Sequence, residues 1–534
     1  MFRKVLAMFC VITLTIAMLS GCAQPGDTPS GSGDTTSDAP TTTPSNSGGD
    51  SNEIDLSYPI VDEKLNVTGM IISDNLDLKE PRQTWVKLED VTNIHIDWET
   101  VNTDSAAVYF ASNDWADIIM YNPEISNDIM ADYGVLGQRF VNFKDYFDYM
   151  PNLVQTIEDY PTAGKVITET DGGIYQLPRI GNDVTAVSAR MYYRQDTLAD
   201  AGCEVPTTTE EFYEVLKKLK DYNNGAAPMA EEATDFLWSS FGPGRSVNFE
   251  DDGSGKVINN RTSDQYKLYL QYMTKLYAEG LINKEYLTLE NNTKISMAQE
   301  GELVFGNAGV GSLAEDAFES GKVEITQLTP LTSEYDDERV VIGWNYARPC
   351  GVAIRSDYEY ITELCRMFDV SYATEEVVEG TGLYDISFSY GLENEHWRWA
   401  NDEHTEYELI LPKELEGVKA FGEFQYESLI YYGIGRFDSF KSATTVTEGN
   451  NKARQQGFAK NLVPYQEEVA FPGSYLKFTE DEQDVLNNKL ISIQEYINQS
   501  MSEFIAGIKN VDTEWDDYVT DINNMGMEEV LDVY

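Results

Sequence analysis

The spacing of apolar residues along the first third of the chain predicts alternating strands and helices. Strands are expected where apolar residues are continuous or alternate with polar ones, and helices where they recur every three or four positions. These patterns predict strands at 65–72, 94–98 and 116–120, and helices at 81–91 and 103–112. Because strands that alternate with helices form a parallel sheet with helical crossovers, we expect an α/β fold.

Polar segments follow the first and third of these predicted strands, at 73–75 and 121–123. In open α/β sheets, ligands bind beyond the carboxyl ends of the strands. Both segments are therefore candidates for a binding edge, although ordinary loops are polar as well.

A second block of mixed elements begins near residue 173. Thr208 and Glu211 have the spacing of a capping box, and an amphipathic helix is predicted directly after them. Short strands are predicted at 301–307 and 323–328.

The C-terminal tail is predicted to be helical. Thr479 and Glu482 have the spacing of a second capping box. The apolar residues after them are spaced by four and three, which predicts one long amphipathic helix: Leu486, Leu490, Ile493, Ile497, Met501 and Phe504. A shorter helix is predicted at 515–522 and should end near Gly526.

The N-terminus resembles a bacterial lipoprotein signal. Arg3 and Lys4 precede an apolar run over 5–19, which is shorter than the roughly 20 residues that a membrane-spanning helix needs. Cys22 follows Leu-Ser-Gly, as in the lipobox. The resemblance implies a signal peptide over 1–21 and a lipid chain, such as palmitate, on Cys22.

The segment after Cys22 is expected to be a flexible tether. Residues 23–52 contain no Val, Ile, Leu, Met or aromatic residue, so they cannot bury enough apolar surface to fold. We therefore assign 22–55 to a lipid anchor and a disordered linker. The protein would touch the membrane through this anchor only.

The chain contains 91 acidic and 38 basic residues, which gives a formal net charge of −53. So acidic a chain is a poor partner for nucleic acid or anionic lipid, and we interpret the charge as a solvated surface. Calcium is a further candidate partner, but 251–255 is only a fragment of a calcium-binding loop and is more typical of a turn. We predict no metal site and no cofactor.

Three cysteines lie in the body of the chain: Cys203, Cys350 and Cys365. Their number is odd and their spacing is not that of a zinc site, so the apolar core must stabilise the body. Whether two of the three form a disulfide stays open.

Several segments, taken in order, resemble the extracellular solute-binding proteins of bacterial ABC importers, in the family that mostly carries sugars and oligosaccharides. They are Asp-Ile-Ile-Met-Tyr at 117–121, Asp-Gly-Gly-Ile-Tyr-Gln-Leu-Pro at 171–178, Met-Tyr-Tyr-Arg-Gln-Asp-Thr-Leu at 191–198, Pro-Thr-Thr-Thr-Glu-Glu-Phe at 206–212 and Gly-Glu-Leu-Val-Phe-Gly-Asn at 301–307. The tail over 478–519 is similar to the family's larger lipoprotein subgroup. The resemblance covers the chain from about residue 56 to its end.

The resemblance implies a periplasmic-binding-protein-like fold, with two α/β lobes, a ligand cleft between them and a helical C-terminal region. Lobe one would contain 56–178 and about 331–380, and lobe two would contain 179–330 and about 381–534. The chain would cross between the lobes at 178–179 and near Pro330. Such a receptor closes about a hinge around its ligand, and an importer can recognise the closed form.

By the same resemblance, six residues are candidate ligand contacts: Tyr121, Asn122, Arg179, Trp238, Asn307 and Trp344. Aromatic rings can cover the apolar face of a sugar, and polar groups can fix its orientation. Each of these residues could instead belong to the core or to an ordinary loop. The segment Glu-His-Trp-Arg-Trp at 395–399 is either a further candidate or an exposed hairpin held by stacking and salt bridges.

These observations favour a lipid-anchored receptor on the outer face of the bacterial cytoplasmic membrane. It would bind a mono- or oligosaccharide by hinge closure, pass it to separate ABC permease subunits, and catalyse no reaction. Two alternatives stay open: a secreted glycoside hydrolase with two carboxylates, and a surface carbohydrate-adhesion module without a closing cleft. The sequence contains no H-E-x-x-H, no G-x-S-x-G and no phosphate-binding loop.

Overall fold

The computed structural model describes residues 54–73, 83–112, 114–121, 125–181, 190–307, 310–311, 324–343, 347–410, 435–436, 443–447, 450–468 and 476–534. All described residues belong to one compact unit, Ile54–Tyr534. The predicted signal peptide, Cys22 and nearly all of the linker lie outside the described residues.

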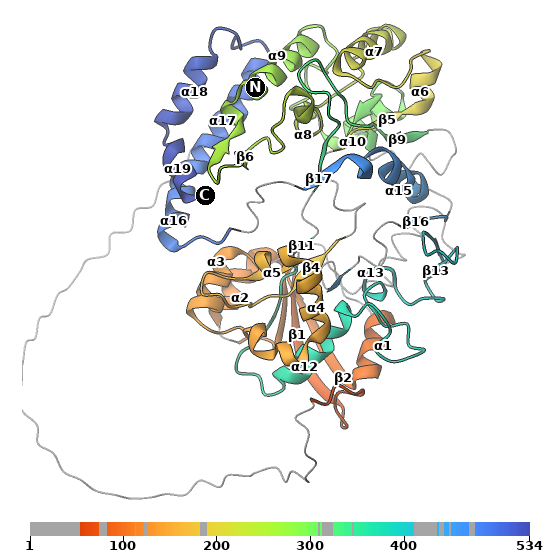
Figure 1. The fold of residues 1–534 in the computed structure, drawn as a ribbon, viewed down its shortest axis with the longest axis vertical. Coiled ribbons are helices and arrows are strands. Elements are labelled where there is room, and N and C mark those ends of the chain that lie inside the picture. Colours follow the sequence, from red (N-terminus) through yellow and green to blue (C-terminus); the bar gives the residue numbers. More distant parts are fainter. Residues whose placement is uncertain are drawn as a thin grey trace, which may run out of the picture. The chain divides into compact units, whose positions relative to one another are not determined.

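Two lobes with separate cores make up the described part of the chain (Figure 1). Helical segments of other pitch are named η here and carry no label in the figure. The first lobe contains β1 (Leu65–Ile72), α1 (Gln83–Thr92), β2 (Ile94–Val101), η1 (Thr103–Ser105), α2 (Ala106–Ser112), β3 (Ile118–Tyr121), α3 (Asn127–Ile129), η2 (Met130–Leu136), η3 (Phe143–Tyr149), α4 (Pro151–Asp159), α5 (Pro161–Ile167), β4 (Pro178–Ile180), β11 (Ala347–Pro349), β12 (Val352–Ile354), α12 (Ile361–Asp369), η7 (Val370–Tyr372), α13 (Ser387–Tyr390), β13 (Trp397–Trp399), β14 (Glu406–Leu409), β15 (Gly435–Arg436) and β16 (Thr444–Thr445).

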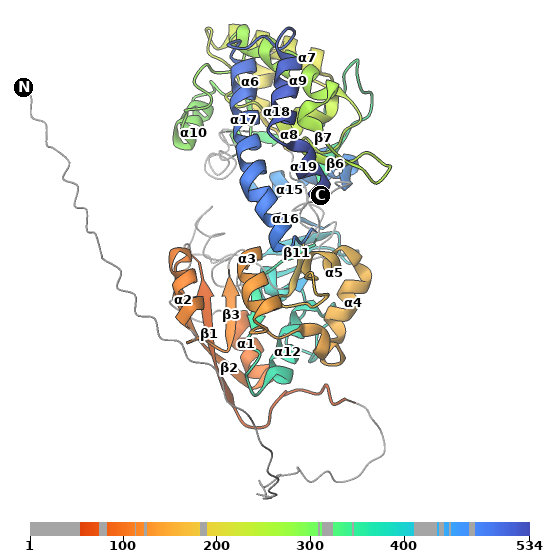
Figure 2. The same ribbon diagram turned by 90° about the vertical axis from the view of Figure 1, so that its left-hand side faces the viewer.

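The first lobe is built on a four-stranded sheet in the order β12-β3-β1-β2. Strand β1 is parallel to both β2 and β3, which confirms the parallel sheet expected from the sequence, and β12 is antiparallel to β3. Side chains alternate across this sheet: Val67 and Ile71 pack with α1 and α12, whereas Met70 and Ile72 pack with α2. Helices therefore cover both faces of the sheet (Figure 2).

Gly69 allows a close approach within this sheet. It lies opposite Trp98 on β2, and a Cβ at this position would lie 2.4 Å from the Trp98 ring. The Trp98 ring also contacts the Trp85 ring of α1 edge to face, with centroids 5.5 Å apart. The glycine therefore makes room for an aromatic pair that joins α1 to the sheet.

The second lobe contains more helix than the first. Its elements are β5 (Tyr192–Arg194), α6 (Gln195–Asp200), α7 (Thr209–Tyr222), α8 (Thr234–Leu237), η4 (Trp238–Phe241), β6 (Phe249–Asp251), β7 (Val257–Asn259), η5 (Asn260–Thr262), α9 (Asp264–Ala278), α10 (Asn291–Gln299), β8 (Phe305–Gly306), β9 (Ile325–Gln327), β10 (Val341–Gly343), α15 (Asn450–Asn461), η9 (Val463–Tyr465), β17 (Gln466–Glu468), α16 (Glu480–Val485), η11 (Leu486–Leu490), α17 (Ile491–Ile505), α18 (Trp515–Asn524) and α19 (Met527–Val533).

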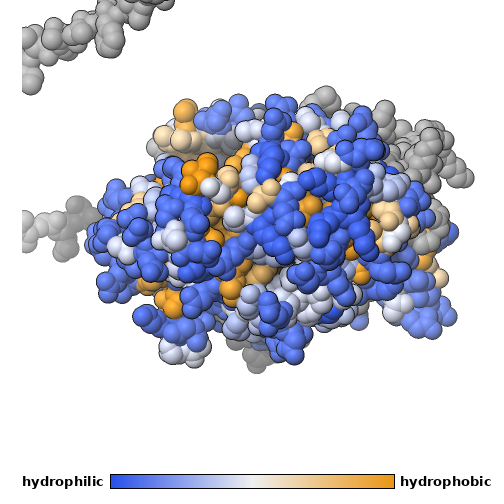
Figure 3. Space-filling model, turned by 90° about the horizontal axis from the view of Figure 1, so that it is seen from above, coloured by the Kyte–Doolittle hydropathy of each residue, from blue (hydrophilic) through white to orange (hydrophobic). Residues whose placement is uncertain are grey.

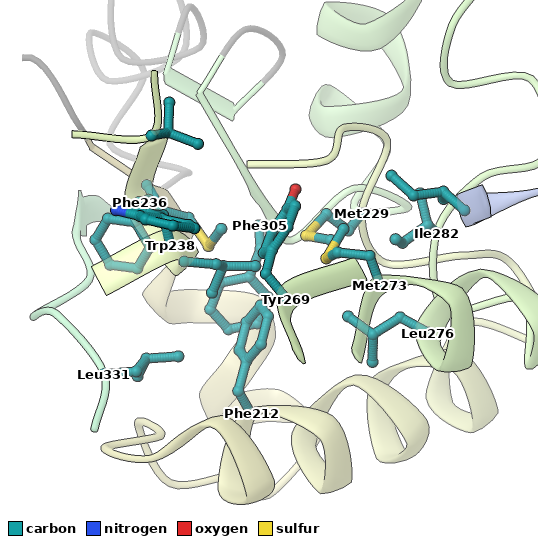
Figure 4. Close-up of a cluster of buried hydrophobic side chains, with 14 of the residues drawn as sticks. Phe212, Met229, Phe236, Trp238, Tyr269, Met273, Leu276, Ile282, Phe305 and Leu331 are labelled. Atoms are coloured by element: carbon teal, nitrogen blue, oxygen red, sulfur yellow. The ribbon is translucent and has the colours of Figure 1, made fainter. Parts of the chain in front are cut away.

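A single cluster of buried side chains forms the core of this lobe (Figure 4). The strands of a small antiparallel sheet, in the order β8-β5-β9, contribute side chains to this core. The helices α7 and α9 and the C-terminal helices contribute to the same core. The strand predicted over 301–307 is only two residues long, Phe305–Gly306, and the one predicted over 323–328 is Ile325–Gln327. The strands that pair with these two segments are themselves short, so the runs of apolar residues predicted strands that are too long.

Both predicted capping positions begin helices, but in different ways. The Thr208 hydroxyl accepts a hydrogen bond from the Glu211 amide at 3.1 Å, whereas the Glu211 carboxylate accepts from Thr207 instead of from Thr208. Thr479 and Glu482 form the complete reciprocal capping box before α16. The long tail helix that follows is divided by the π-helical segment η11, and its Leu486 is buried in the second core.

The two cores divide the chain at different residues from the boundaries expected from the sequence. Leu331 and Val341 belong to the second-lobe core, although 331–380 was assigned to lobe one. Leu383 and Phe388 belong to the first-lobe core, although 381 onward was assigned to lobe two. The reason is tertiary: the Leu331 carbonyl accepts a hydrogen bond from Ser240 at 2.9 Å, which keeps this segment on the second lobe.

Cys203, Cys350 and Cys365 are all free thiols, which answers the question that the sequence left open. Residues 251–255 form the turn of the β6–β7 hairpin, where the Asp251 carboxylate accepts hydrogen bonds from the Gly253 and Gly255 amides. Hydrophilic residues cover most of the face shown in Figure 3. Among the described residues, no helix is long and apolar enough to cross a bilayer.

Candidate functional site

The carboxyl ends of the parallel strands β1, β2 and β3 meet at one edge of the first-lobe sheet. The Ser73 amide, directly after β1, donates to the Val101 carbonyl at the end of β2 at 2.9 Å. The half-buried Tyr121 ends β3, and its amide donates to the Gly351 carbonyl at 2.8 Å. The structure therefore places Tyr121 at the edge where ligands bind in open α/β sheets.

A tight turn at Cys350–Gly351 lies between this edge of the sheet and β4, the strand after which the chain leaves the first lobe. Gly351 has φ of 73°, a left-handed conformation that favours glycine. The preceding Cys350 donates its amide to the Leu177 carbonyl at 2.9 Å, and the Leu177 amide donates to Val352 at 3.3 Å. The segment before β4 is thereby fixed beside the end of β3.

A three-stranded sheet, in the order β11-β4-β15, forms at this crossover. Arg179 lies directly opposite Arg348 in the antiparallel register of β4 and β11. Their neighbours Ile180 and Ala347 are buried in the first-lobe core, so the two arginine side chains lie on the other face of the sheet. Arg179 is half-buried and Arg348 is exposed.

The charges of both guanidinium groups act on the turn. Burial raises the pKa of the Cys350 thiol to about 12, while the positive charges of Arg179 and Arg348 act to lower it. Burial also raises the pKa of the Tyr390 hydroxyl, which a hydrogen bond with Tyr407 and the charge of Arg179 act to lower. The charge of Arg179 thus acts both on the turn and on an aromatic group that comes from later in the chain.

That aromatic group is a small subdomain of the strands β13, β14 and β16. Trp397 is fully buried in its own cluster, and the ring of Trp399 stacks on that of His404 with centroids 4.4 Å apart. Arg398 and Glu408 form an ion pair across the hairpin at 2.6 Å. Of the two interpretations of 395–399, these contacts fit the hairpin held by stacking and a salt bridge, but the hairpin is not exposed throughout, because His396 and Trp397 are buried.

In the second lobe, Asn307 is exposed directly after β8. Its amide donates a hydrogen bond to the carboxylate of Glu231. The same carboxylate lies 3.3 Å from the position that a Cβ on Gly306 would occupy. The polar group beside Asn307 is therefore an acidic one, which the sequence analysis did not single out.

Trp238 lies in the core, so its expected role as a ligand contact is wrong in this structure. The ring lies among the buried side chains of the second lobe and has no exposed surface (Figure 4). It packs beside the Tyr266 ring, with centroids 6.2 Å apart. A ring without exposed surface cannot stack on a sugar in this conformation. Asn122 and Trp344 lie outside the described residues.

The structure thus places Tyr121 at the carboxyl end of β3, Arg179 in β4 of the crossover sheet and Asn307 in the other lobe. Arg348 and Glu231 are polar neighbours that sequence reasoning missed, because only the folded chain brings them beside Arg179 and Asn307. In the described segments, no three His, Cys, Asp or Glu side chains are grouped as a metal site requires. The arrangement offers hydrogen bonds, charge and aromatic faces to a ligand.

Comparison with known proteins gives one relative that matches nearly the full chain and one that matches just under half of it, although no protein-family model matches. The chain is 25% identical over 511 residues to the fructooligosaccharide ABC transporter substrate-binding protein FusA of Streptococcus pneumoniae serotype 4, covering 89% of this chain and 90% of that protein. It is 25% identical over 262 residues to lipoprotein LipO of Bacillus subtilis, covering 46% and 48%.

Among solved structures, the chain is similar to an HMO-binding, ABC-transporter-associated solute-binding protein of Bifidobacterium longum infantis. The TM-score is 0.68 at 18% identity, over 88% of this chain and 98% of that one. The fold is therefore that of the solute-binding proteins, and the relatives in sequence include an ABC-transporter substrate-binding protein. Both findings agree with the family that the ordered segments of the sequence resemble.

Proposed function

We propose that this protein is the extracellular receptor of an ABC importer and that it binds an oligosaccharide without changing it chemically. The observation that carries the proposal is the match to FusA, which spans nine-tenths of both chains and so includes both lobes. FusA is named for fructooligosaccharides, and the structural neighbour is named for HMO. A carbohydrate is thus the ligand class that these relatives support.

Closure of the two lobes around the ligand is the proposed mechanism. Each lobe has its own core, and the chain passes between them after β4, between β10 and β11, and between β16 and α15. A ligand that contacts both lobes at once binds the closed form better, so it shifts the population towards closure. Tyr121 and Arg179 would supply contacts from the first lobe, and Asn307 from the second. Asn122 and Trp344 are proposed contacts of the same kind.

We also propose that a lipid chain on Cys22 holds the receptor at the outer face of the cytoplasmic membrane. The support is the basic start, the short apolar run and Leu-Ser-Gly-Cys in the sequence, together with a relative that is named a lipoprotein. Residues 23–52 would act as the tether. The permease and ATPase subunits of the importer would be separate chains.

A ligand screen with recovery of the ligand tests the proposal. The purified protein is heated with a series of neutral and acidic oligosaccharides, and a bound saccharide should raise the melting temperature. Binding at a hundredfold excess over Kd stabilises a folded protein by about 2.7 kcal/mol. The stabilising saccharide should be recovered intact by mass spectrometry. Cleaved saccharide would point to the hydrolase, and binding to polymers alone would point to the adhesion module.

A further inference from the structure

An ion pair joins the two lobes at a point away from the covalent crossovers. The Lys477 Nζ lies 3.0 Å from the Glu169 carboxylate, and it donates a hydrogen bond to the Asn127 side-chain oxygen at 3.4 Å. Lys477 precedes α16 of the second lobe, whereas Glu169 and Asn127 belong to segments of the first lobe. One side chain at the start of the C-terminal helices therefore contacts two residues of the other lobe.

The residues directly after Lys477 fix it to the second lobe. The Phe478 ring contacts the Tyr534 ring edge to face, with centroids 5.6 Å apart. The Tyr534 ring packs in turn against Phe249 of β6, with centroids 4.6 Å apart. Thr479 caps α16, and the helical segment that follows enters the second-lobe core. The chain on the C-terminal side of Lys477 is thus held on the second lobe.

The partners of Lys477 are equally fixed in the first lobe. Glu169 begins a tight turn shortly after α5, and its carbonyl accepts the Gly172 amide at 2.8 Å. Helix α5 packs against β4 and β11, two strands of the crossover sheet. Asn127 is the first residue of α3, which follows Tyr121 and β3 in the chain. Lys477 therefore contacts elements that adjoin the crossover sheet and that follow the strand ending at Tyr121.

Both charged groups of this pair are largely removed from water. The side chains of Lys477 and Glu169 are only 10% and 6% exposed. Burial raises the pKa of Glu169, whereas the positive charge of Lys477 acts to lower it. A buried ion pair adds little net stability, because lost hydration offsets the attraction between the charges. Such a pair can instead select one arrangement of the two surfaces that it joins.

We infer that Lys477 is a positioning residue that limits how far the two lobes separate in the ligand-free protein. The inference deepens the proposed closure of the lobes, and in this sense it rests on the proposed function. Wider separation at this point would part the Lys477 ammonium from the Glu169 carboxylate, so the pair favours arrangements in which the lobes stay close. A receptor restrained in this way has less motion to complete when it closes on a saccharide.

Small-angle X-ray scattering of the ligand-free protein tests this inference. The double variant Lys477→Met with Glu169→Gln removes both charges together, so that neither charge is left buried without its partner. Its radius of gyration should exceed that of the wild type by about 1 Å or more, against about 23 Å for a compact body of the size of 54–534. Its circular dichroism should match that of the wild type, because both lobes remain folded.

Two further variants complete the experiment. Lys489→Met with Glu529→Gln removes an ion pair of 2.6 Å that lies within the second lobe, and this matched control should keep the wild-type radius of gyration. Phe478→Ala loosens the anchorage of Lys477 on the second lobe without changing either charge. It should also raise the radius of gyration, and it decides the question if the double variant does not fold.

The outcomes separate this inference from the proposed function. A folded double variant with the wild-type radius of gyration would show that the pair does not restrain the lobes. A smaller radius of gyration would show that the pair holds the lobes apart, which also overturns the inference. No saccharide enters these measurements. If every saccharide fails to bind in the ligand screen, the receptor function is lost, whereas the restraint is judged by scattering alone.

Discussion

Asp369 should make the stability of the first lobe depend on pH in a direction opposite to that of an ordinary carboxylate. It lies at the end of α12, almost fully buried, and it caps the N-terminus of α4. Its carboxylate accepts hydrogen bonds from the Leu153 amide at 2.8 Å and from the amide and side chain of Asn152 at 3.2 and 2.8 Å. These donors favour the charged form, but burial outweighs them and raises the pKa of Asp369 from 3.8 to about 7.

The sign and size of the effect follow from this shift. Between about pH 4 and pH 7 the unfolded chain has lost the Asp369 proton and the folded chain has kept it, so the folded state weakens as pH rises. A shift of roughly three pKa units corresponds to about 4 kcal/mol. This contribution is fully present below the unfolded pKa and is lost as pH rises through the folded pKa.

The variant Asp369→Asn isolates the contribution. It should be less stable than the wild type at about pH 4.5, by about 1–3 kcal/mol, because an amide NH₂ would face backbone N–H donors. The deficit should shrink, or reverse, as the pH rises to about 8, by a total of about 4 kcal/mol. Urea unfolding curves at several pH values measure the difference, and Asp221→Asn, at an exposed carboxylate in α7, is the control.

The reasoning is refuted if the difference between wild type and Asp369→Asn is independent of pH. It is refuted more strongly if the deficit of the variant grows as pH rises. The three hydrogen bonds would then dominate over burial, and Asp369 would be an ordinary charged cap.

Three further predictions concern packing, ligand contacts and buried groups. Lys477→Met should cost about 3–5 kcal/mol in urea unfolding, because Lys477 pairs with the buried Glu169 at 3.0 Å, and adding Glu169→Gln should recover most of the loss. Lys489→Met, at a half-buried lysine that pairs with the exposed Glu529, should cost less than about 1 kcal/mol. Equal losses at both lysines would contradict the burial argument. Trp238→Ala should lower stability by about 3–5 kcal/mol, whereas Tyr121→Ala should mainly weaken saccharide binding; the reverse pattern would return Trp238 to the ligand site. Burial raises the pKa of Cys350 to about 12, so its thiol should react with Ellman's reagent only after unfolding. In a Cys203→Ser variant, which lacks the half-buried thiol, rapid reaction in the native protein would show that a buried thiol is accessible.

The first-lobe sheet could be predicted from the sequence because each strand carries its own signal. Val67 and Ile71 on one face of β1, and Met70 and Ile72 on the other, are apolar in a pattern that local residues alone determine. The same holds for the capping box at Thr479, which needs only four consecutive residues. Local sequence patterns were sufficient to predict the elements that are determined by residues close together in the sequence.

The lobe boundaries and much of the site depend on contacts between distant parts of the chain. Leu331 belongs to the second lobe because Ser240 holds its carbonyl, and no spacing near Leu331 reveals this. A tryptophan can stack on a sugar or pack in a core, so the residue type alone does not assign Trp238. Its packing beside the Tyr266 ring assigns it to the core. Arg348 becomes a candidate only when β11 pairs with β4 and places it opposite Arg179.

Small-angle X-ray scattering of the protein with and without a saturating saccharide tests the receptor mechanism most directly. Closure of two lobes about their crossovers predicts a smaller radius of gyration in the bound form, with the saccharide recovered unchanged. An identical radius of gyration with a tightly bound saccharide would contradict the mechanism.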